Sequence, residues 1–246
     1  MGKSANRGRP RPRGSGHQRR SQPYQRPRPR PARRLGWGRR ATILGVAVGT
    51  VVAFGIGATR SESSAPAAPG PLIGPEGAAL ETGPLLGSAA STSPGVSVDG
   101  ISCLAGEQLA YHIHVHLDVY DHGQPTTLPL GIGIVGATQV LKTAAGDFVA
   151  GGSCLYWLHV HATDGIIHVE SPLRKTFALG QFFDEWRQPL GPEQVAVVHG
   201  PVTAFVDGRR YQGDPRTIRL TPHEVIQLDV GDPVTPPQPF TFPSGL

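Results

Sequence analysis

Apolar and polar residues alternate strictly between positions 111 and 119 of the chain. Every odd position is apolar, and the even positions hold His112, His114, His116 and Asp118. A period of two is typical of a β-strand that buries one face. The pattern predicts a half-buried strand that carries three histidines on its polar side.

A second alternating pattern predicts a hairpin of two strands, Leu155 to Ala162 and Ile166 to Glu170, joined by the turn sequence Asp164-Gly165. A two-residue turn would pair Thr163 with Ile166, so that His161 lies opposite His168 and His159 lies opposite Glu170. Directly paired residues point to the same side of a sheet. One face of this hairpin should therefore present His159, His161, His168 and Glu170 together.

The other periodic segments are short. Positions 126–135 read as the strand that returns after the first, and 195–198, 202–206, 210–212 and 223–230 read as further strands, with Asp207-Gly208 as a hairpin turn. Apolar residues at helical spacing predict one short helix behind an N-cap at Thr176; they are Leu179, Phe182, Phe183 and Trp186. We expect a mainly β (β-rich α+β) fold, an antiparallel sheet or sandwich with one short helix.

The first 97 residues have a different composition. Residues 1–40 contain 14 of the 23 Lys and Arg and no Asp or Glu, which leaves 9 basic and 18 acidic residues for the rest of the chain. A segment so rich in charge, Pro and Gly cannot bury enough apolar surface to offset its ordering entropy. We expect a disordered basic tail at 1–40 and, from its Ala, Pro, Gly and Ser content, a flexible stalk at 60–97. The folded domain would then span 98–246.

Residues 41–59 carry no charge and are long enough to cross about 30 Å of hydrocarbon as a helix. Arginines at 33, 34, 39 and 40 against a single Arg60 place the tail in the cytoplasm and the domain outside. The expected partners are the lipid bilayer for 41–59 and anionic lipid headgroups for the tail. A cleaved signal sequence is the alternative for this segment, and nucleic-acid binding is the alternative for the tail.

Cys103 and Cys154 are the only two cysteines. In an exported domain a cysteine pair is usually a disulfide, and this one would close a loop of about 50 residues. A pair of metal ligands is the less favoured interpretation.

Up to six imidazoles and one carboxylate would crowd one surface if the two histidine-bearing elements were neighbours. We predict a divalent metal site, with zinc or copper as the ion because neutral imidazole binds both. The candidate ligands are His112, His114, His116, His159, His161, His168 and Glu170. The His-x-His spacing resembles the zinc site of α-carbonic anhydrases, and His-x-His strands also recur in cupins and copper proteins. This resemblance covers the ligand spacing alone.

Other functions remain open. A metal-dependent enzyme of unknown substrate could use Glu170, Asp164 or Asp118 as an acid or base. The histidine face could also be a solvated surface without a ligand, a pH-responsive surface, or part of a stalked interaction module. Three other histidines, at positions 122, 199 and 223, are weaker candidates for ligands.

Glycines at 131, 133 and 136 spell the dinucleotide-binding pattern, but they lie in an apparent strand instead of opening a helix. We interpret them as positions where another part of the backbone comes close. The aromatic residues around position 182 are interpreted as core.

Four motifs resemble a group of uncharacterised exported or membrane-anchored prokaryotic proteins that has no established activity. They are HxHxHL from His112, YWLHxH from Tyr156, GIIHxESP from Gly165 and LGQFFxxW from Leu179. The resemblance spans about residues 110–190 and implies no chemistry of its own.

Overall fold

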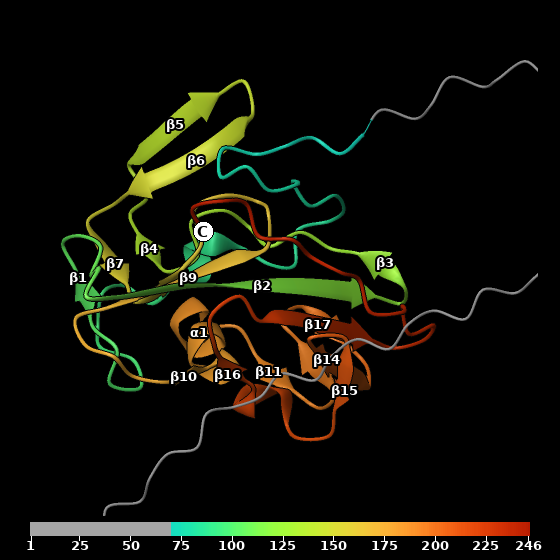
Figure 1. Ribbon diagram of the computed structural model, residues 1–246. Helices are drawn as coiled ribbons and strands as arrows, with labels where there is room; N and C mark the ends of the chain where they lie inside the picture. The colour runs from blue at the N-terminus through green and yellow to red at the C-terminus, as the bar shows by residue number, and fades with distance from the viewer. Residues whose placement is uncertain (1–69) are drawn as a thin grey trace, which may run out of the picture. The chain divides into compact units, whose positions relative to one another are not determined.

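The structure is a computed structural model that describes residues 70–246 (Figure 1). The basic tail, the 41–59 segment and the first part of the expected stalk lie outside the described residues. Within 70–246 no helix is long and apolar enough to cross a membrane. The predicted fold class is confirmed in its main feature, because the domain is built mainly from β-strands with one α-helix.

The central sheet has six strands in line, in the order β15-β14-β17-β2-β9-β8, with β3 paired to the far end of β2. Their bounds are β15 Arg209–Tyr211, β14 Val202–Val206, β17 Val225–Val230, β2 Tyr111–Asp121, β9 Ile166–Ser171, β8 Leu158–His159 and β3 Gln124–Pro125. All pairs are antiparallel except β17 with β2, which run parallel. The sheet is therefore mixed, whereas we expected an antiparallel one.

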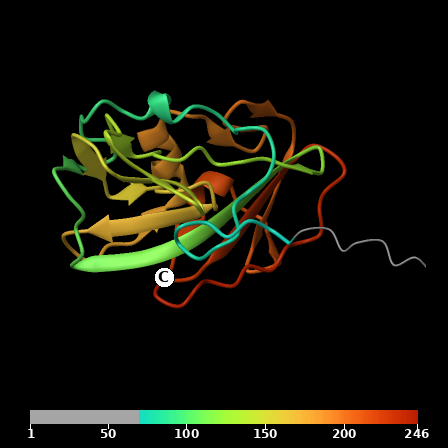
Figure 2. The ribbon, with the colours of Figure 1, turned by 90° about the horizontal axis from the view of Figure 1, so that it is seen from above.

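The alternation along β2 forms the strand as predicted, and its apolar residues enter the main core. Helix α1 (Leu179–Trp186) packs into the same core through Phe182, Phe183 and Trp186. Figures 1 and 2 show the helix packed beside the central sheet, and the segment before β2 reaches the helix, because the Ser93 N–H donates to the Glu185 carbonyl. The helix begins after Ala178, whose N–H donates to the Gln181 side chain, so the predicted N-cap at Thr176 is wrong.

Several predicted strands are shorter or broken. The stretch 126–135 is mostly a loop that ends in β4 (Ile134–Val135), and 155–162 is divided into β7 (Cys154–Tyr156) and β8. β7 lies between β4 and β1 (Cys103–Leu104) in a small separate sheet. Further small sheets pair β5 (Gln139–Thr143) with β6 (Gly146–Gly151), β10 (Phe177–Ala178) with β16 (Arg219–Leu220), and β11 (Leu190–Gly191) with β12 (Gln194–Val195) and β13 (Val198–His199). Two 3-10 turns, Ala89–Ser91 and Pro215–Thr217, complete the elements.

The predicted disulfide is confirmed: Cys103 and Cys154 are bonded, with their Cα atoms 5.4 Å apart. It joins β1 to β7, which pair directly next to it. No other cysteine exists to compete for this pairing.

Residues 70–97, which we expected to belong to a flexible stalk, pack against the domain. Leu86 is 1% exposed and belongs to the main core, and its N–H donates to the Thr127 carbonyl. The same segment also contacts α1, since the indole N–H of Trp186 donates to the Ser88 carbonyl. The folded domain therefore begins well before Val98, and the small-residue composition of this segment concealed a few buried anchors.

This segment also changes the character of β2. We expected a half-buried strand, but His114 and His116 are both buried. Glu76 reaches β9 from residues 70–97, and Phe240 of the C-terminal segment stacks on His116. Both faces of β2 are therefore covered at His114 and His116, whereas His112 near the start of the strand is exposed.

Candidate metal centre

The site lies on β2, β9 and β8, at the β8 end of the central sheet. His114 pairs with His168 across β2 and β9, and His168 pairs in turn with His159 on β8. His112 lies opposite Glu170. Because directly paired residues point to the same side, the sheet brings all five side chains onto one face.

The hairpin register that we predicted is wrong by two residues. We placed His161 opposite His168, whereas the structure pairs His159 with His168. β8 ends at His159 because the next backbone groups bond elsewhere, Val160 with the 131–132 loop and His161 with Val149. A six-residue connection replaces the expected two-residue turn. A shift of two positions keeps each side chain on its own face, so the expected residues still meet.

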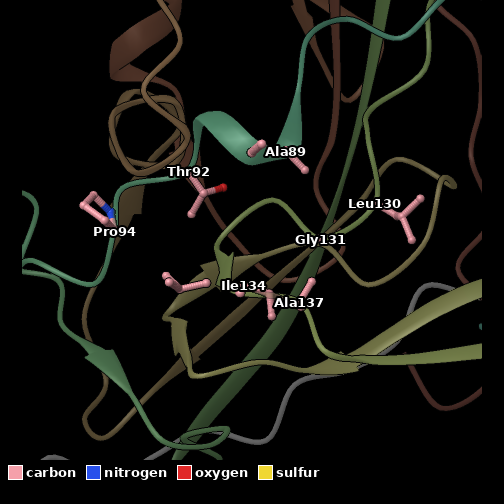
Figure 3. Close-up of a pocket in the computed structure, with 10 residues that line it drawn as sticks. Ala89, Thr92, Pro94, Leu130, Gly131, Ile134 and Ala137 are labelled. Atoms are coloured by element: carbon pink, nitrogen blue, oxygen red, sulfur yellow. The ribbon is translucent and has the colours of Figure 1, made fainter.

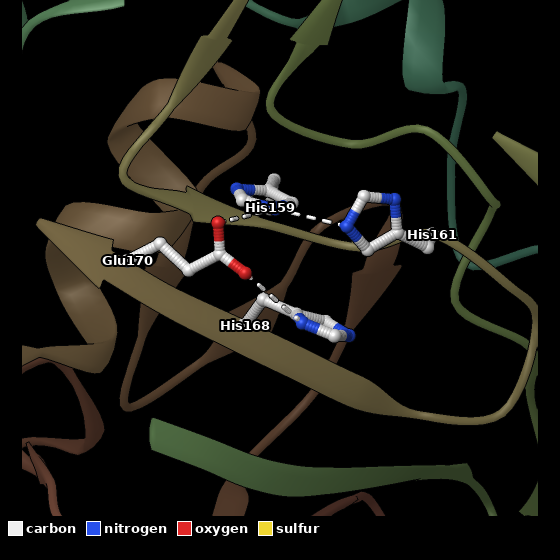
Figure 4. A group of neighbouring side chains, drawn as sticks. All are labelled: His159, His161, His168 and Glu170. Carbon is white, nitrogen blue, oxygen red and sulfur yellow. Dashed lines mark hydrogen bonds and ion pairs between the residues drawn. The ribbon is translucent and has the colours of Figure 1, made fainter. Parts of the chain in front are cut away.

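Four residues form an inner cluster in which one candidate ligand atom from each lies within 4.8 Å of the others (Figure 4). They are His159, His161, His168 and Glu170, and none is more than 5% exposed. The Nε2 atoms of His159 and His161 are 3.0 Å apart. A carboxylate oxygen of Glu170 lies 3.9 Å from His159 Nε2, and the other lies 3.6 Å from His168 Nδ1. Three imidazoles and a carboxylate are a ligand set that zinc and copper(II) accept.

The backbone fixes which nitrogen of His159 and His161 faces the cluster. His159 Nδ1 donates to the Tyr156 carbonyl at 2.8 Å, and His161 Nδ1 donates to the Val149 carbonyl at 2.5 Å. A carbonyl oxygen can only accept, so each Nδ1 carries the proton and each neutral ring turns the lone pair of Nε2 inward. Phe148 stacks on His161 at a ring-centroid distance of 4.8 Å and holds the ring from its other side.

His168 is oriented by a carboxylate instead. Its Nε2 lies 2.8 Å from Glu76 Oε1, with both side chains no more than 7% exposed. Its Nδ1 is buried and has no hydrogen-bond partner among the described residues, and the same holds for Glu170 Oε2. Each of the four residues thus commits one polar atom to the protein or to a neighbouring side chain and leaves another directed into the cluster.

Burial sets the protonation of the inner cluster. It lowers the pKa of His159 well below its usual value, with further lowering from His161 and His168, and it lowers the pKa of His161 in the same way. For His168, burial alone would lower the pKa, but the Glu170 and Glu76 carboxylates raise it to about 9. His159 and His161 are therefore neutral at neutral pH, the form in which imidazole binds a metal.

His112 and His114 form an outer group with His168, again with one candidate ligand atom each within 4.8 Å of the others. His112 Nε2 lies 3.1 Å from Glu170 Oε1, and its side chain is 37% exposed. His114 is buried, and its Nε2 has no hydrogen-bond partner in the described chain. Burial, then the neighbouring His168 and His112, lower the pKa of His114 to about 3.

His116 lies apart from both groups, although the sequence placed it with them. Its ring stacks on Phe240 with centroids 3.6 Å apart, and its Nδ1 lies 3.5 Å from Asp118 Oδ2. It sits beside Gly165, where a Cβ atom would come within 2.7 Å of His116 Nε2. His116 lines a separate pocket of about 480 Å³ with Asp118 and Glu81. Along β2, His116 lies beyond the part of the strand that contacts the two groups.

The three weaker histidine candidates also lie outside both groups. His122 bonds Asp121 in an exposed turn, and His199 bonds Gln194 at the surface. His223 bonds the Leu246 carbonyl at 2.8 Å.

Sequence reasoning missed two carboxylates near the inner cluster. Glu76 lies 92 residues before its partner His168, in the segment that we expected to be a stalk. Glu107 Oε1 lies 3.8 Å from His161 Nε2, on the loop that leads into β2. Isolated glutamates in irregular segments give no periodic signal, so no pattern in the chain could have selected them.

The pocket in Figure 3 is a different place. It has a volume of about 450 Å³ and lies between the 89–94 segment and the 130–137 loop. Its walls include Leu130, Ile134 and Thr92, and they contain no histidine or carboxylate. Of the glycines in this loop, Gly133 has the expected close backbone neighbour, since a Cβ atom there would lie 2.3 Å from the Leu158 carbonyl oxygen, whereas Gly131 and Gly136 meet only side chains.

The comparisons with known proteins add no relative to this picture. The chain matches no family model, no curated protein and no solved structure. The function is therefore argued from the cluster itself.

Proposed function

We propose that this domain binds a transition-metal ion, zinc or copper(II), through His159, His161, His168 and Glu170. The observation that carries the proposal is the pair of Nε2 atoms on His159 and His161, 3.0 Å apart with both Nδ1 atoms already donating. Two neutral rings in this arrangement turn lone pairs toward each other, which is repulsive with nothing between them. Two imidazole nitrogens bound to one tetrahedral zinc ion at about 2.0–2.1 Å would lie at a similar separation, roughly 3.3 Å.

The remaining atoms support the same conclusion. Glu170 Oε2 and His168 Nδ1 are buried polar atoms without a hydrogen-bond partner in the described part of the chain, and His168 would release a proton when it binds a metal. Such atoms are costly in a folded protein unless a ligand satisfies them. Glu76 on His168, and the two carbonyls on the other imidazoles, are the kind of outer partners that orient metal-binding histidines.

The inner cluster favours tight binding over catalysis. All four residues of the cluster are buried, and the gap on the side of His159 and Glu170 is too narrow for a water molecule. A catalytic zinc site keeps an open position for water or substrate, whereas a closed site holds its ion through protein ligands alone.

Metal analysis of the full-length chain, purified without a polyhistidine tag, tests the proposal. We expect stoichiometric zinc or copper, and at least a hundredfold weaker binding in His159→Gln. His122→Asn is the matched control, because it removes an exposed histidine outside the cluster, and it should bind like the wild type. A wild-type chain that neither contains these metals nor binds them at micromolar concentrations would exclude the function.

We further propose that residues 41–59 anchor the domain outside the cytoplasmic membrane as a single-pass helix, with the basic tail at the anionic inner surface. Support comes from the uncharged 19-residue run and its flanking arginines. The disulfide is consistent with an oxidising compartment. Membrane fractions washed with carbonate should retain the full-length chain, and protease added outside should remove the domain. Release of a shorter, soluble chain would instead identify a cleaved signal sequence.

A further inference from the structure

Beside the inner cluster, the outer histidines have features that one bound ion does not explain. His112 and His114 form a group of candidate ligands with His168, which also belongs to the inner cluster, and His112 contacts Glu170 of that cluster. The His168 ring lies between the two groups, with its centroid 4.6 Å from the His114 ring and 4.6 Å from the His161 ring. The two groups are therefore adjacent and distinct.

His114 is the residue that most needs a partner. It is 6% exposed, and its Nε2 has no hydrogen-bond partner among residues 70–246. The 3.1 Å contact between His112 Nε2 and Glu170 Oε1 accounts for His112 without any ligand, but it leaves His114 Nε2 unsatisfied. Buried polar atoms in native proteins are almost always paired, so an unpaired one next to two further candidate ligands indicates a missing ligand.

Glu170 connects the two groups. Its Oε1 lies 3.1 Å from His112 Nε2, and its Oε2 lies 3.9 Å from His159 Nε2. Oε2 therefore faces the inner cluster, whereas Oε1 lies between His112 and the shared His168, 3.6 Å from His168 Nδ1. Paired metal ions in proteins commonly lie about 3.5–4 Å apart, a spacing that one carboxylate can bridge.

The outer group reaches solvent, whereas the inner cluster is buried. The His159 side chain is 1% exposed, whereas that of His112 is 37% exposed. An ion held by the outer group would meet solvent, and three protein ligands would leave it a position for water.

We propose that His112 and His114 bind a second divalent transition-metal ion, with Glu170 of the inner cluster as the shared third ligand. This proposal rests on the proposed function of the inner cluster. The inner ion is the buried, retained one, and the outer ion is the exchangeable one at the solvent side.

Stoichiometry of the full-length chain tests the second ion. Equilibrium dialysis against zinc should give two ions per wild-type chain and one per chain of the double variant His112→Gln/His114→Gln. The matched control is His122→Asn/His199→Gln, which removes two histidines outside both groups and should still bind two. The single variant His112→Gln, at an exposed position, should weaken the outer ion at least tenfold and settles the matter if the double variant does not fold.

Copper(II) provides a second readout. The first equivalent should give the electron paramagnetic resonance spectrum of an isolated ion, and the second should add a half-field signal from two coupled ions. That signal should be absent from His112→Gln/His114→Gln. One ion per wild-type chain, lost in His159→Gln, would overturn the second site and leave the proposed function intact, as would two ions in the outer double variant. No bound ion in the wild type would overturn both.

Discussion

Single side chains outside the ligand set decide how well the ligands are held, and Glu76 is the clearest case. Its carboxylate lies 2.8 Å from His168 Nε2 and fixes the direction of Nδ1. Removing such an outer partner costs about 10–100-fold in metal affinity in other proteins. We expect Glu76→Gln to weaken zinc binding by about that factor, measured by competition with a chromophoric chelator. Glu193→Gln, at an exposed position, should bind like the wild type; equal affinities for Glu76→Gln and the wild type would show that His168 needs no orientation.

Glu185 makes a different prediction, about stability. It is completely buried in α1, and neither of its carboxylate oxygens has a hydrogen-bond partner among the described residues. Burial, followed by the carboxylates of Asp99 and Asp184, raises the pKa of Glu185 well above its usual value, and the nearby Leu158 backbone offsets only part of this. The folded state therefore keeps the proton at pH values where the unfolded state has lost it.

The sign follows from proton linkage. Stability contributed by protonated Glu185 is present below its unfolded pKa and declines as pH rises from there toward the raised folded pKa. Glu185→Gln removes this decline. Urea unfolding at pH 5 and pH 8 should show the variant gaining about 1–3 kcal/mol relative to the wild type at the higher pH. If the free energies of unfolding of Glu185→Gln and the wild type differ by the same amount at pH 5 and pH 8, the raised pKa of Glu185 is contradicted.

At the scale of elements, the inner cluster depends on how closely the 131–133 loop crosses β8. A Cβ atom at Gly133 would lie 2.3 Å from the Leu158 carbonyl oxygen and 2.8 Å from His159 Cβ, and the φ of +76° already disfavours an L side chain. We expect Gly133→Ala to lower the free energy of unfolding by more than about 2 kcal/mol and to weaken metal binding through His159. Gly191→Ala is the control, because no atom lies within 4 Å of its added Cβ, and it should change stability by less than about 0.5 kcal/mol. Similar unfolding curves for the two variants would refute the close crossing.

The strands also show how much of the fold and of the site could be predicted from the sequence. Alternation places side chains on faces, so it predicted β2, β9 and the shared side of His159, His168 and Glu170. The register could not be predicted, because it depends on backbone bonds from Val160 and His161 to segments far along the chain. The error was an even number of positions, which is why the predicted residues still converge. Alternation also says nothing about where along a strand a cluster ends, and for that reason His116 was grouped with residues that it does not meet.

At the scale of the whole molecule, the disulfide is a constraint on the unfolded chain. Cys103 and Cys154 are 51 residues apart, and a bond across such a loop is worth about 4 kcal/mol in the chain-entropy model. The enclosed loop carries His112 and His114, while His159, His161, His168 and Glu170 follow it in the sequence. The bond thus stabilises the domain without supplying any of the proposed ligands.

The double variant Cys103→Ala/Cys154→Ala separates these roles. In metal-free protein its free energy of unfolding should fall by about 4 kcal/mol, measured with urea under oxidising conditions. Each ion present at a hundred times its dissociation constant should restore about 2.7 kcal/mol in the variant and the wild type alike, since ligand linkage depends only on the folded site. Unequal gains, or a variant that folds but binds no metal, would mean that the disulfide shapes the site. Equal gains would show that metal binding does not depend on the disulfide, and that the disulfide and the bound metal stabilise the fold independently.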